Sequence, residues 1–469
     1  MDFRDYDGLE DVLLPTSSLG QVLRSLRRST LSIPNRLRSI QADASFVQEV
    51  AGAYGLPLIA NERCGSWYIP PERRRERVYF KSTDGHAGTW AFSLRRLNLQ
   101  LLEVIAEAGG CIIVDSTRRG KVMPDALSKT VPIWCAVLNR ILFPQLRDAH
   151  ALHTPPRCVS SSEHDQVKSL LSHFSDQLQG IKLDVEGLRK LIKKPLRPLW
   201  VTQDSSLPVE PPQFTDFLPI ILCTSSRRVA EGDVAADGYI QGAGDDNEGW
   251  SLGLSADVFW QNQTILLNAS EDSLPALIQE LMDGSSGPHS VTAATPTLIR
   301  NTTWLYTAHD QVLHDRLKYE AFDLIIHCSI TPNCEVADRM QKRYLYLKCR
   351  GHKLGSRDLR EELSKLHTCL EPNSLPPRTL VCCQTGTDLS LGVALALLCL
   401  QAVSEVSNND LSLRAGRIEK SMPITKDVIR HRLSWIAASC PNAQPSRATL
   451  QSVNAFLMNG NPSQANDIR

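Results

Sequence analysis

The sequence lacks the cysteine patterns that a disulfide framework or a zinc site requires. Its 13 cysteines form no C-x-x-C pair and follow no regular spacing, and most of them lie within apolar runs. Cysteines in such surroundings are typical of the reduced core of an intracellular protein. The pattern therefore excludes a small, disulfide-rich secreted domain.

Long apolar segments are also absent. The longest run, Leu391 to Leu400, is shorter than the about 20 residues that a membrane-spanning helix needs. Residues Met1 to Asp11 are acidic and contain no apolar core of a secretory signal. We therefore expect no membrane partner and place the protein in the cytoplasm.

The chain has no net charge, because 51 Lys and Arg balance 51 Asp and Glu. The balance hides an asymmetry: residues 1 to 200 carry 28 basic against 21 acidic residues, and the remainder carries 23 against 30. The first part is thus basic by 7, which favours a polyanion as its partner. A length of 469 residues allows two or three domains of ordinary size.

The stretch from Gly109 to Trp134 combines a buried strand with a cationic turn. Cys111 to Val114 is a short, β-branched run that predicts a strand buried on both faces. The turn D-S-T-R-R-G-K follows where α/β folds hold phosphate and ribose groups. We interpret it as an anion-binding loop, although a strand-to-helix turn with solvated charges has the same composition. The candidate ligands are Ser116, Thr117, Arg118, Arg119, Gly120 and Lys121.

A second polar turn, K-S-T-D-G-H at Lys81 to His86, follows the apolar residues Val78 to Phe80. It carries a carboxylate and an imidazole that could accept a proton, and the same residue types also occur in ordinary turns. We take Lys81, Ser82 and Thr83 as candidate anion ligands, and Asp84 and His86 as candidate catalytic residues.

Other charged residues suggest RNA and metal contacts. Helices are predicted from Gln21 to Tyr54 and from Leu94 to Ala108. Their arginines fit an RNA backbone or simply a solvated face, and the candidates are Arg36, Arg38, Arg95 and Arg96. Further on, a glycine-rich turn between Tyr239 and Trp250 holds Asp245 and Asp246, which predict a Mg²⁺ site or a solvated loop.

The last 170 residues have a separate organisation. A strand at Thr379 to Cys383, a polar loop and an apolar helix outline the phosphate loop of a cysteine phosphatase, with Gly386 and Ser390 at the expected spacing from Cys383. The arginine expected six residues after the cysteine is Leu389, and the histidine usual before it is Cys382. Because phosphatase chemistry needs a stabilised thiolate and an arginine fork, we expect a phosphatase-like fold with a structural Cys383.

Several segments together resemble the tRNA 2′-O-ribosylphosphate transferases, or initiator tRNA phosphoribosyltransferases, from about Leu23 to Phe456. The segments are S-I-P-N-R-L-R-S-I at Ser32 to Ile40, L-P-L-I-A-N-E-R-C-G-S-W-Y at Leu56 to Tyr68, F-K-S-T-D-G-H at Phe80 to His86, the D-S-T-R-R-G-K loop and Y-I-Q-G-A-G-D-D at Tyr239 to Asp246. The resemblance implies transfer of 5-phosphoribosyl from phosphoribosyl pyrophosphate to the ribose 2′-hydroxyl of a T-stem adenosine in initiator methionine tRNA. It also implies that the mark excludes this tRNA from elongation.

Under that resemblance the cationic loop would contact the phosphates. Asp115 would be catalytic by holding the ribose hydroxyls or Mg²⁺, as acids at a strand tip do in ordinary phosphoribosyltransferases. Those enzymes have two adjacent acids and a T-G-x-T turn, which this chain lacks, so their fold is not expected here. We expect no DNA partner. The competing hypothesis is a tRNA-binding pseudophosphatase without transferase activity.

The fold expected is α/β with two domains: an N-terminal phosphoribosyl-transfer domain and a C-terminal domain like a dual-specificity phosphatase. We expect a flexible terminus at residues 1–20, the transfer domain at 21–270, a linker at 271–300 and the phosphatase-like domain at 301–469. An alternative architecture makes the N-terminal region a permuted relative of the C-terminal domain, with Asp115 where Cys383 stands and Lys121 where Leu389 stands. In it, Ile220 to Ile240 would correspond to Leu324 to Leu347.

Overall fold

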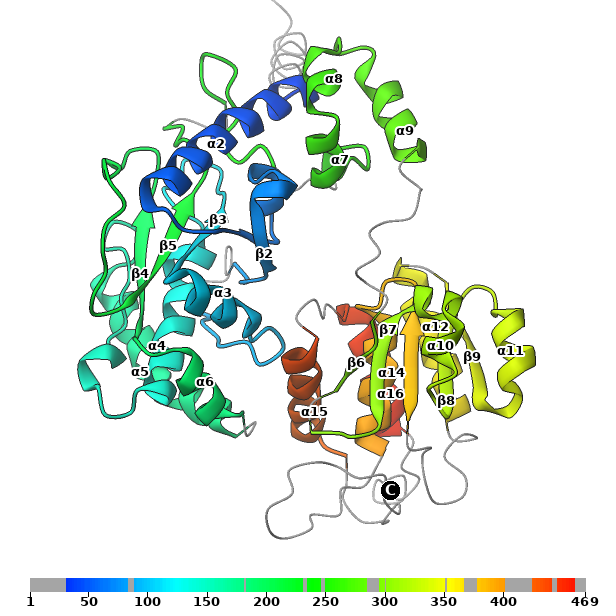
Figure 1. Cartoon of the computed structure of the whole chain (residues 1–469). Helices are drawn as coiled ribbons and strands as arrows, with labels where there is room; N and C mark the ends of the chain where they lie inside the picture. Colours follow the sequence, from blue (N-terminus) through cyan, green and yellow to red (C-terminus); the bar gives the residue numbers. More distant parts are fainter. Residues whose placement is uncertain are drawn as a thin grey trace, which may run out of the picture.

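The computed structural model describes two α/β domains, each with its own sheet and hydrophobic core (Figure 1). The residues described are 31–82, 88–180, 183–230, 234–245, 249–284, 295–299, 301–350, 352–366, 378–400, 424–440 and 445–459. The expected flexible terminus at 1–20 lies outside these ranges. The mixed α/β class predicted for both domains is confirmed.

The N-terminal domain is built on a sheet in which all neighbouring strands are parallel, in the order β2-β1-β3-β5-β4. Its strands are β1 (Leu58–Asn61), β2 (Arg74–Val78), β3 (Cys111–Asp115), β4 (Leu196–Val201) and β5 (Leu218–Thr224). The central strand β3 contributes alternate residues to two cores, one on each face of the sheet. The predicted strand buried on both faces is therefore confirmed.

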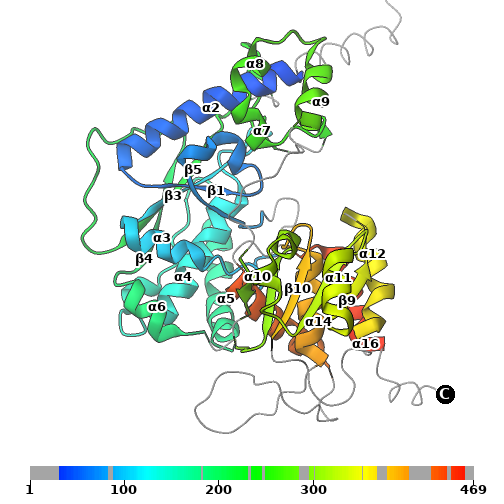
Figure 2. The same ribbon diagram turned by 45° about the vertical axis from the view of Figure 1, so that its right-hand side comes forward.

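Helices cover both faces of this sheet. Those on one face are α3 (Gln100–Ala108), α4 (Val131–Leu142), α5 (Ser161–Gln179) and α6 (Val185–Leu191). Those on the other are α2 (Ile33–Tyr54), α7 (Ala256–Gln261), α8 (Gln263–Asn268) and α9 (Leu274–Gly284), and Figure 2 shows α2 crossing the sheet toward the last three. The start of α2 is fixed by Ser32, whose hydroxyl accepts a hydrogen bond from Asn35 N (3.5 Å).

The C-terminal domain has a second five-stranded sheet in the order β6-β7-β10-β8-β9, parallel except for the pair β6 and β7. Its strands are β6 (Thr297–Leu298), β7 (Leu305–His309), β8 (Leu324–Ser329), β9 (Tyr344–Lys348) and β10 (Thr379–Cys383). Its helices are α10 (Arg316–Tyr319), α11 (Cys334–Met340), α12 (His352–Glu362), α14 (Leu389–Leu400), α15 (Lys426–Ser439) and α16 (Arg447–Asn459). None of the helices in the described ranges is both long and apolar enough to cross a membrane.

The two sheets share one strand order after a circular permutation of the chain. Strands β1, β2 and β3 occupy the places of β8, β9 and β10, and β5 and β4 occupy those of β7 and β6. The central strands therefore correspond, and Asp115 ends one as Cys383 ends the other. The strand directions differ only at the last pair, since β4 and β5 are parallel whereas β6 and β7 are antiparallel.

One expected correspondence within that permutation is wrong. Ile240 forms only an isolated bridge with Val234, so no strand stands there to match β9. The place of β8 and β9 is taken by β1 and β2. A strand was also expected at the apolar residues Val78 to Phe80, but β2 has the polar sequence R-R-E-R-V and ends at Val78. A strand at the sheet edge needs no continuous apolar run.

The expected domain boundaries need two corrections. Helix α9 lies in the segment expected to be a linker, and its Leu274 and Ile278 are fully buried in the N-terminal core. The first domain therefore continues to Gly284, and β6 already belongs to the second sheet at Thr297. The segment 147–197 also belongs to the first domain, since it contains α5 and α6 and leads directly into β4.

Gly65, at the start of the short helix η1 (Gly65–Tyr68), has no room for a side chain. A Cβ there would lie 2.5 Å from the carbonyl oxygen of Val114 and 3.1 Å from the backbone of Ala60. We expect Gly65→Ala to lower the free energy of unfolding by about 1 to 3 kcal/mol, measured by urea denaturation. The control Gly52→Ala, in open space on α2, should stabilise by up to about 1 kcal/mol. Equal stabilities would contradict the tight approach of η1 to β3.

Candidate active site

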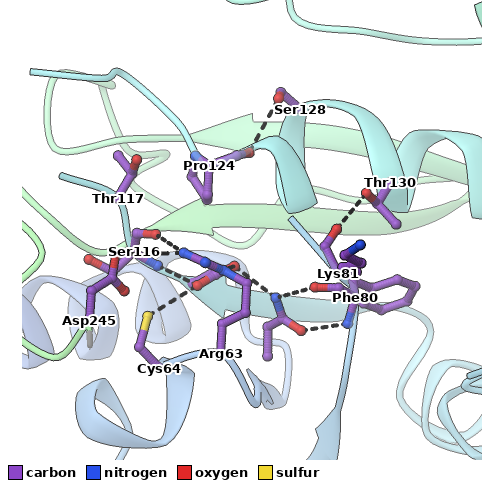
Figure 3. Close-up of polar contacts among 12 residues, drawn as sticks. Arg63, Cys64, Phe80, Lys81, Ser116, Thr117, Pro124, Ser128, Thr130 and Asp245 are labelled. Atoms are coloured by element: carbon purple, nitrogen blue, oxygen red, sulfur yellow. Dashed lines mark hydrogen bonds and ion pairs between the residues drawn. The ribbon is translucent and has the colours of Figure 1, made fainter. Parts of the chain in front are cut away.

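Asp115, at the end of β3, is the fully buried centre of the site. Figure 3 shows the polar contacts of this region, with Arg63, Cys64, Ser116 and Asp245 labelled. Its Oδ2 accepts hydrogen bonds from Asn61 Nδ2 (2.7 Å) and Arg63 Nε (3.1 Å). Its Oδ1 accepts from Cys64 Sγ (3.2 Å) and from the backbone N of Ser116 (2.8 Å). Four donors therefore bind this carboxylate, and it ties the end of β3 to β1 and to the turn after β1.

Arg63 extends the network to a second carboxylate. Its Nη2 lies 3.6 Å from Asp245 Oδ2 and donates to the carbonyl of Ser116 (3.3 Å). Burial alone would lower the pKa of Arg63, but Asp115 and other neighbours including Asp245 raise it above its ordinary value, so the guanidinium stays charged. Burial raises the pKa of Asp245 to about 6, against the opposing effect of Arg63.

Asn61 brings the two polar turns together. Its Nδ2 donates a hydrogen bond to the carbonyl of Phe80 (3.1 Å), and its Oδ1 accepts one from the backbone N of Phe80 (2.7 Å). The next residue, Lys81, is exposed, and its carbonyl accepts from Thr130 Oγ1 (2.8 Å). The K-S-T-D-G-H turn thus leaves the sheet beside Asp115. Of its candidates, Lys81 and Ser82 are described, whereas Thr83, Asp84 and His86 lie outside the described residues.

Gln241 fixes the conformation of the cationic loop. Its Oε1 accepts from the backbone N of Gly120 (3.0 Å) and of Val229 (3.1 Å), and its Nε2 donates to the carbonyl of Lys121 (2.8 Å). Gly120 and Arg119 both have left-handed backbones, with φ of 69° and 57°. The loop is therefore held in one shape.

The cationic loop turns outward along its length. Ser116 and Thr117 are buried, Arg118 is half-buried, and Arg119 and Lys121 are exposed. Hydroxyls and backbone thus line its base, with positive charge at its rim. Such an arrangement suits an anion that enters from solvent.

The four arginines proposed for RNA have different environments. Arg36 donates through Nη1 to the carbonyl of Ala243 (3.0 Å) and lies 5.3 Å from the Trp250 ring, so it supports the turn before Asp245. Arg95 and Arg96 precede α3, which begins only at Gln100. Arg96 is half-buried over the Tyr79 ring (3.4 Å). The exposed Arg38 and Arg95 remain candidates for RNA contacts.

The described residues offer no preformed metal cage. Within the described ranges, no group of three or more His, Cys, Asp or Glu is arranged to hold a metal ion. Of the two predicted ligands, Asp245 faces Arg63 and Asp246 lies outside the described residues. Mg²⁺ sites often rely on one or two carboxylates plus substrate phosphates, so these residues by themselves do not fit an independent Mg²⁺ site.

The second sheet carries a phosphate loop without its cation. The buried Cys383 donates through Sγ to Ser390 Oγ (3.2 Å). Gly386 has a φ of 65°, and a Cβ there would lie 2.9 Å from the backbone N of His309. Leu389 is buried in the core where the anion-binding arginine would stand. The loop therefore carries a cysteine bonded to Ser390 and a leucine in place of a guanidinium.

Four residues of this site were not among the candidates: Asn61, Arg63, Cys64 and Gln241. Each lies in a segment that the sequence did single out, N-E-R-C-G-S-W-Y or Y-I-Q-G-A-G-D-D. A polar segment directly after a buried strand, with an arginine two residues beyond it, was the available signal. Nothing in the sequence indicated that Gln241 would bind the backbone of a loop 120 residues away.

Removing Arg63 would leave the buried Asp115 carboxylate without its cation. We expect Arg63→Ala to lower the free energy of unfolding by about 3 kcal/mol, and Asp115→Asn in the same chain to recover part of that loss. Chemical denaturation of the four chains of the cycle measures this coupling. The control Arg75→Ala breaks an exposed pair with Glu107 (2.8 Å) and should cost at most about 1 kcal/mol. Additive effects at positions 63 and 115 would contradict the pairing.

Comparisons with known proteins agree with this two-domain structure. Residues 26–283 match the family described as Rit1 N-terminal domain, and residues 343–457 match the Rit1 DUSP-like domain. The chain is 35% identical to the tRNA A64-2′-O-ribosylphosphate transferase of Saccharomyces cerevisiae, over 94% of this chain and 95% of that protein. It is 34% identical to an uncharacterised protein of Schizosaccharomyces pombe, over 91% and 94%.

Solved phosphatase structures are similar to part of the chain. The Yvh1 phosphatase domain from Chaetomium thermophilum is 12% identical, with a TM-score of 0.26, and covers 36% of this chain and 100% of that one. Human DUSP28 is 11% identical, with a TM-score of 0.24, over 35% and 95%. Residues 26–283 match the family's N-terminal domain, and the Saccharomyces cerevisiae transferase is 35% identical over 94% of the chain. The chain therefore belongs to the Rit1 family.

Proposed function

We propose that the chain is a tRNA 2′-O-ribosylphosphate transferase that modifies initiator methionine tRNA. The observation that carries this proposal is the 35% identity, over 94% of the chain, to a transferase of that name. The cationic loop beside Asp115 supports it, because a phosphorylated sugar donor needs an anion site. The donor we propose is phosphoribosyl pyrophosphate and the acceptor a T-stem adenosine, so that the product is excluded from elongation.

The reaction exchanges one bond for another at the anomeric carbon. The 2′-oxygen of the adenosine bonds to C1 of the donor ribose as the bond from C1 to the pyrophosphate oxygen breaks. The hydroxyl proton passes to a base and pyrophosphate leaves. Positive charge develops on the ribose and negative charge on the leaving group, so cations at the rim of the loop, Arg118, Arg119 and Lys121, would stabilise the departure of pyrophosphate.

Asp245 is the base that the described residues favour. Asp115 has all four hydrogen bonds already filled, whereas Asp245 has a pKa of about 6 and so is ionised and still basic near neutral pH. Arg63 connects the two carboxylates and would orient Asp245. Asp84 and His86 remain further candidates from the sequence.

Mg²⁺ is part of the proposal as a companion of the pyrophosphate. When bound, it would neutralise phosphate charge on the donor, held mainly by the substrate phosphates. We assign no step to the ion. The protein would act in the cytoplasm, where its cysteines stay reduced.

The second candidate function is a tRNA-binding pseudophosphatase without transfer. The observation that favours it is the C-terminal loop, which keeps its shape while Leu389 replaces the arginine. A domain in that state can bind but not hydrolyse a phosphoester. It is also compatible with the transferase, in which the C-terminal domain would position tRNA.

The transferase and the pure binder differ in one product. We expect initiator tRNA incubated with the protein, phosphoribosyl pyrophosphate and Mg²⁺ to gain one ribosyl phosphate on a single adenosine, detected by mass spectrometry after digestion. Lys121→Ala should slow transfer by about a hundredfold without weakening tRNA binding, because it removes stabilisation of the leaving group. The control Cys383→Ser should transfer at the normal rate. Tight tRNA binding with no adduct would favour the pseudophosphatase.

Transfer should also depend on pH through Asp245. Only the carboxylate accepts a proton, so the rate should fall as pH falls through about 6, about tenfold per unit below it. Single-turnover rates between about pH 5 and pH 8 measure this limb, with circular dichroism as a check on folding. Asp245→Asn should be slower and lack the limb. A limb that persists in Asp245→Asn would assign the base to another residue, such as His86.

A further inference from the structure

The pattern of the cationic loop occurs a second time, on the neighbouring strand. Strand β3 ends in D-S-T-R-R at residues 115–119, and β5 ends in T-S-S-R-R at residues 224–228. Asp115 is the register partner of Thr224 in the parallel pair. The same series of two hydroxyls and two arginines therefore leaves adjacent strands at the same edge of the sheet.

The two loops are bonded to each other. Ser226 Oγ accepts from the backbone N of Thr117 (3.2 Å) and donates to its carbonyl (2.9 Å). Arg228 Nε donates to the carbonyl of Gly120 (2.9 Å). Gln241 joins them again by accepting from both Gly120 and Val229. The two loops thus form one rigid unit.

Buried groups hold the second loop from behind. Tyr239 Oη accepts from the backbone N of Arg227 (2.8 Å) and donates to the fully buried Asp43 (2.8 Å to Oδ1). The Arg227 guanidinium lies 4.4 Å from the Tyr239 ring and pairs with Asp237 at the surface (2.7 Å). The exposed Arg227 is therefore held in place by the Tyr239 ring on one side and by the exposed Asp237 carboxylate.

The base of the second loop contains hydroxyls with nothing to bind. Thr224 Oγ1 and Ser225 Oγ are fully buried, and neither has a hydrogen-bond partner among the described residues. An unpaired buried hydroxyl is unfavourable and calls for an explanation such as a ligand. Together with two exposed arginines, these hydroxyls repeat the chemistry of the first loop.

We propose that residues 225–228 form a second phosphate-binding loop, and that the two loops hold one sugar donor by its two phosphorylated ends. Adjacent strands lie about 4.8 Å apart, which brings the loops within the span of a ribose that carries phosphate at both ends. This inference rests on the proposed function. A single phosphate would occupy only one loop.

The test measures binding of donor fragments to the full chain in the absence of tRNA. Calorimetry with phosphoribosyl pyrophosphate, pyrophosphate and ribose 5-phosphate gives three affinities for each variant. Arg227→Gln should weaken binding of the donor by roughly tenfold to a hundredfold and should weaken binding of one fragment selectively. Lys121→Ala should instead weaken binding of the other fragment. Ser225→Ala should weaken the same fragment as Arg227→Gln without lowering thermal stability, because its hydroxyl has no partner to lose.

The chain offers a matched control and distinct contrary outcomes. Arg75→Gln breaks an exposed arginine pair like that of Arg227, on an edge strand away from the loops, and should change no affinity. If substitutions in both loops weaken binding of the same fragment, or if Arg227→Gln weakens only tRNA binding, the two-loop donor site is wrong. The proposed transferase function would still stand. If the normal chain binds no donor and forms no adduct, both the site and the transferase are wrong.

Discussion

The buried contact between Asp115 and Arg63 determines how the rest of the N-terminal domain can be arranged. A carboxylate at the end of a central parallel strand is unfavourable unless it is paired, and its partners come from β1 and the turn that follows it. The pairing therefore fixes the neighbour of β3. Asn61, in the same contact, places the exit of the K-S-T-D-G-H turn. One ion pair thus joins three segments that carry the chemistry.

The two domains use the end of a central strand in opposite ways. In the N-terminal domain the central strand ends in Asp115, which forms an ion pair with Arg63, and a loop with three cations follows. In the C-terminal domain it carries a thiol bonded to Ser390, and a leucine fills the place of the cation. The two domains thus share one strand order. The side chains that follow the central strand determine whether the loop there is suited to bind an anion.

The sequence was informative wherever the local pattern matched the final environment. A β-branched run predicted β3, and the spacing around Cys383 predicted β10 and the phosphatase-like domain. Strand β2 was misplaced because its arginines suit a sheet edge and give no apolar signal. The partners of Asp115, and the role of Gln241, depend on which strands are neighbours. That information is absent from residue types and spacing, so the sequence alone could not supply the contacts that support the candidate site.

The long sequence separation of the contacts around the loop has a consequence for the order of events during synthesis. Gly120 and Gln241, which bond to each other, are 121 residues apart. At about 5 to 20 residues per second, the loop waits about 6 to 24 s for its closing partner after it is made. Contacts of such long range also fold slowly. A nascent chain therefore makes the cationic loop early, whereas the contacts that hold its shape form only after Gln241 has been synthesised.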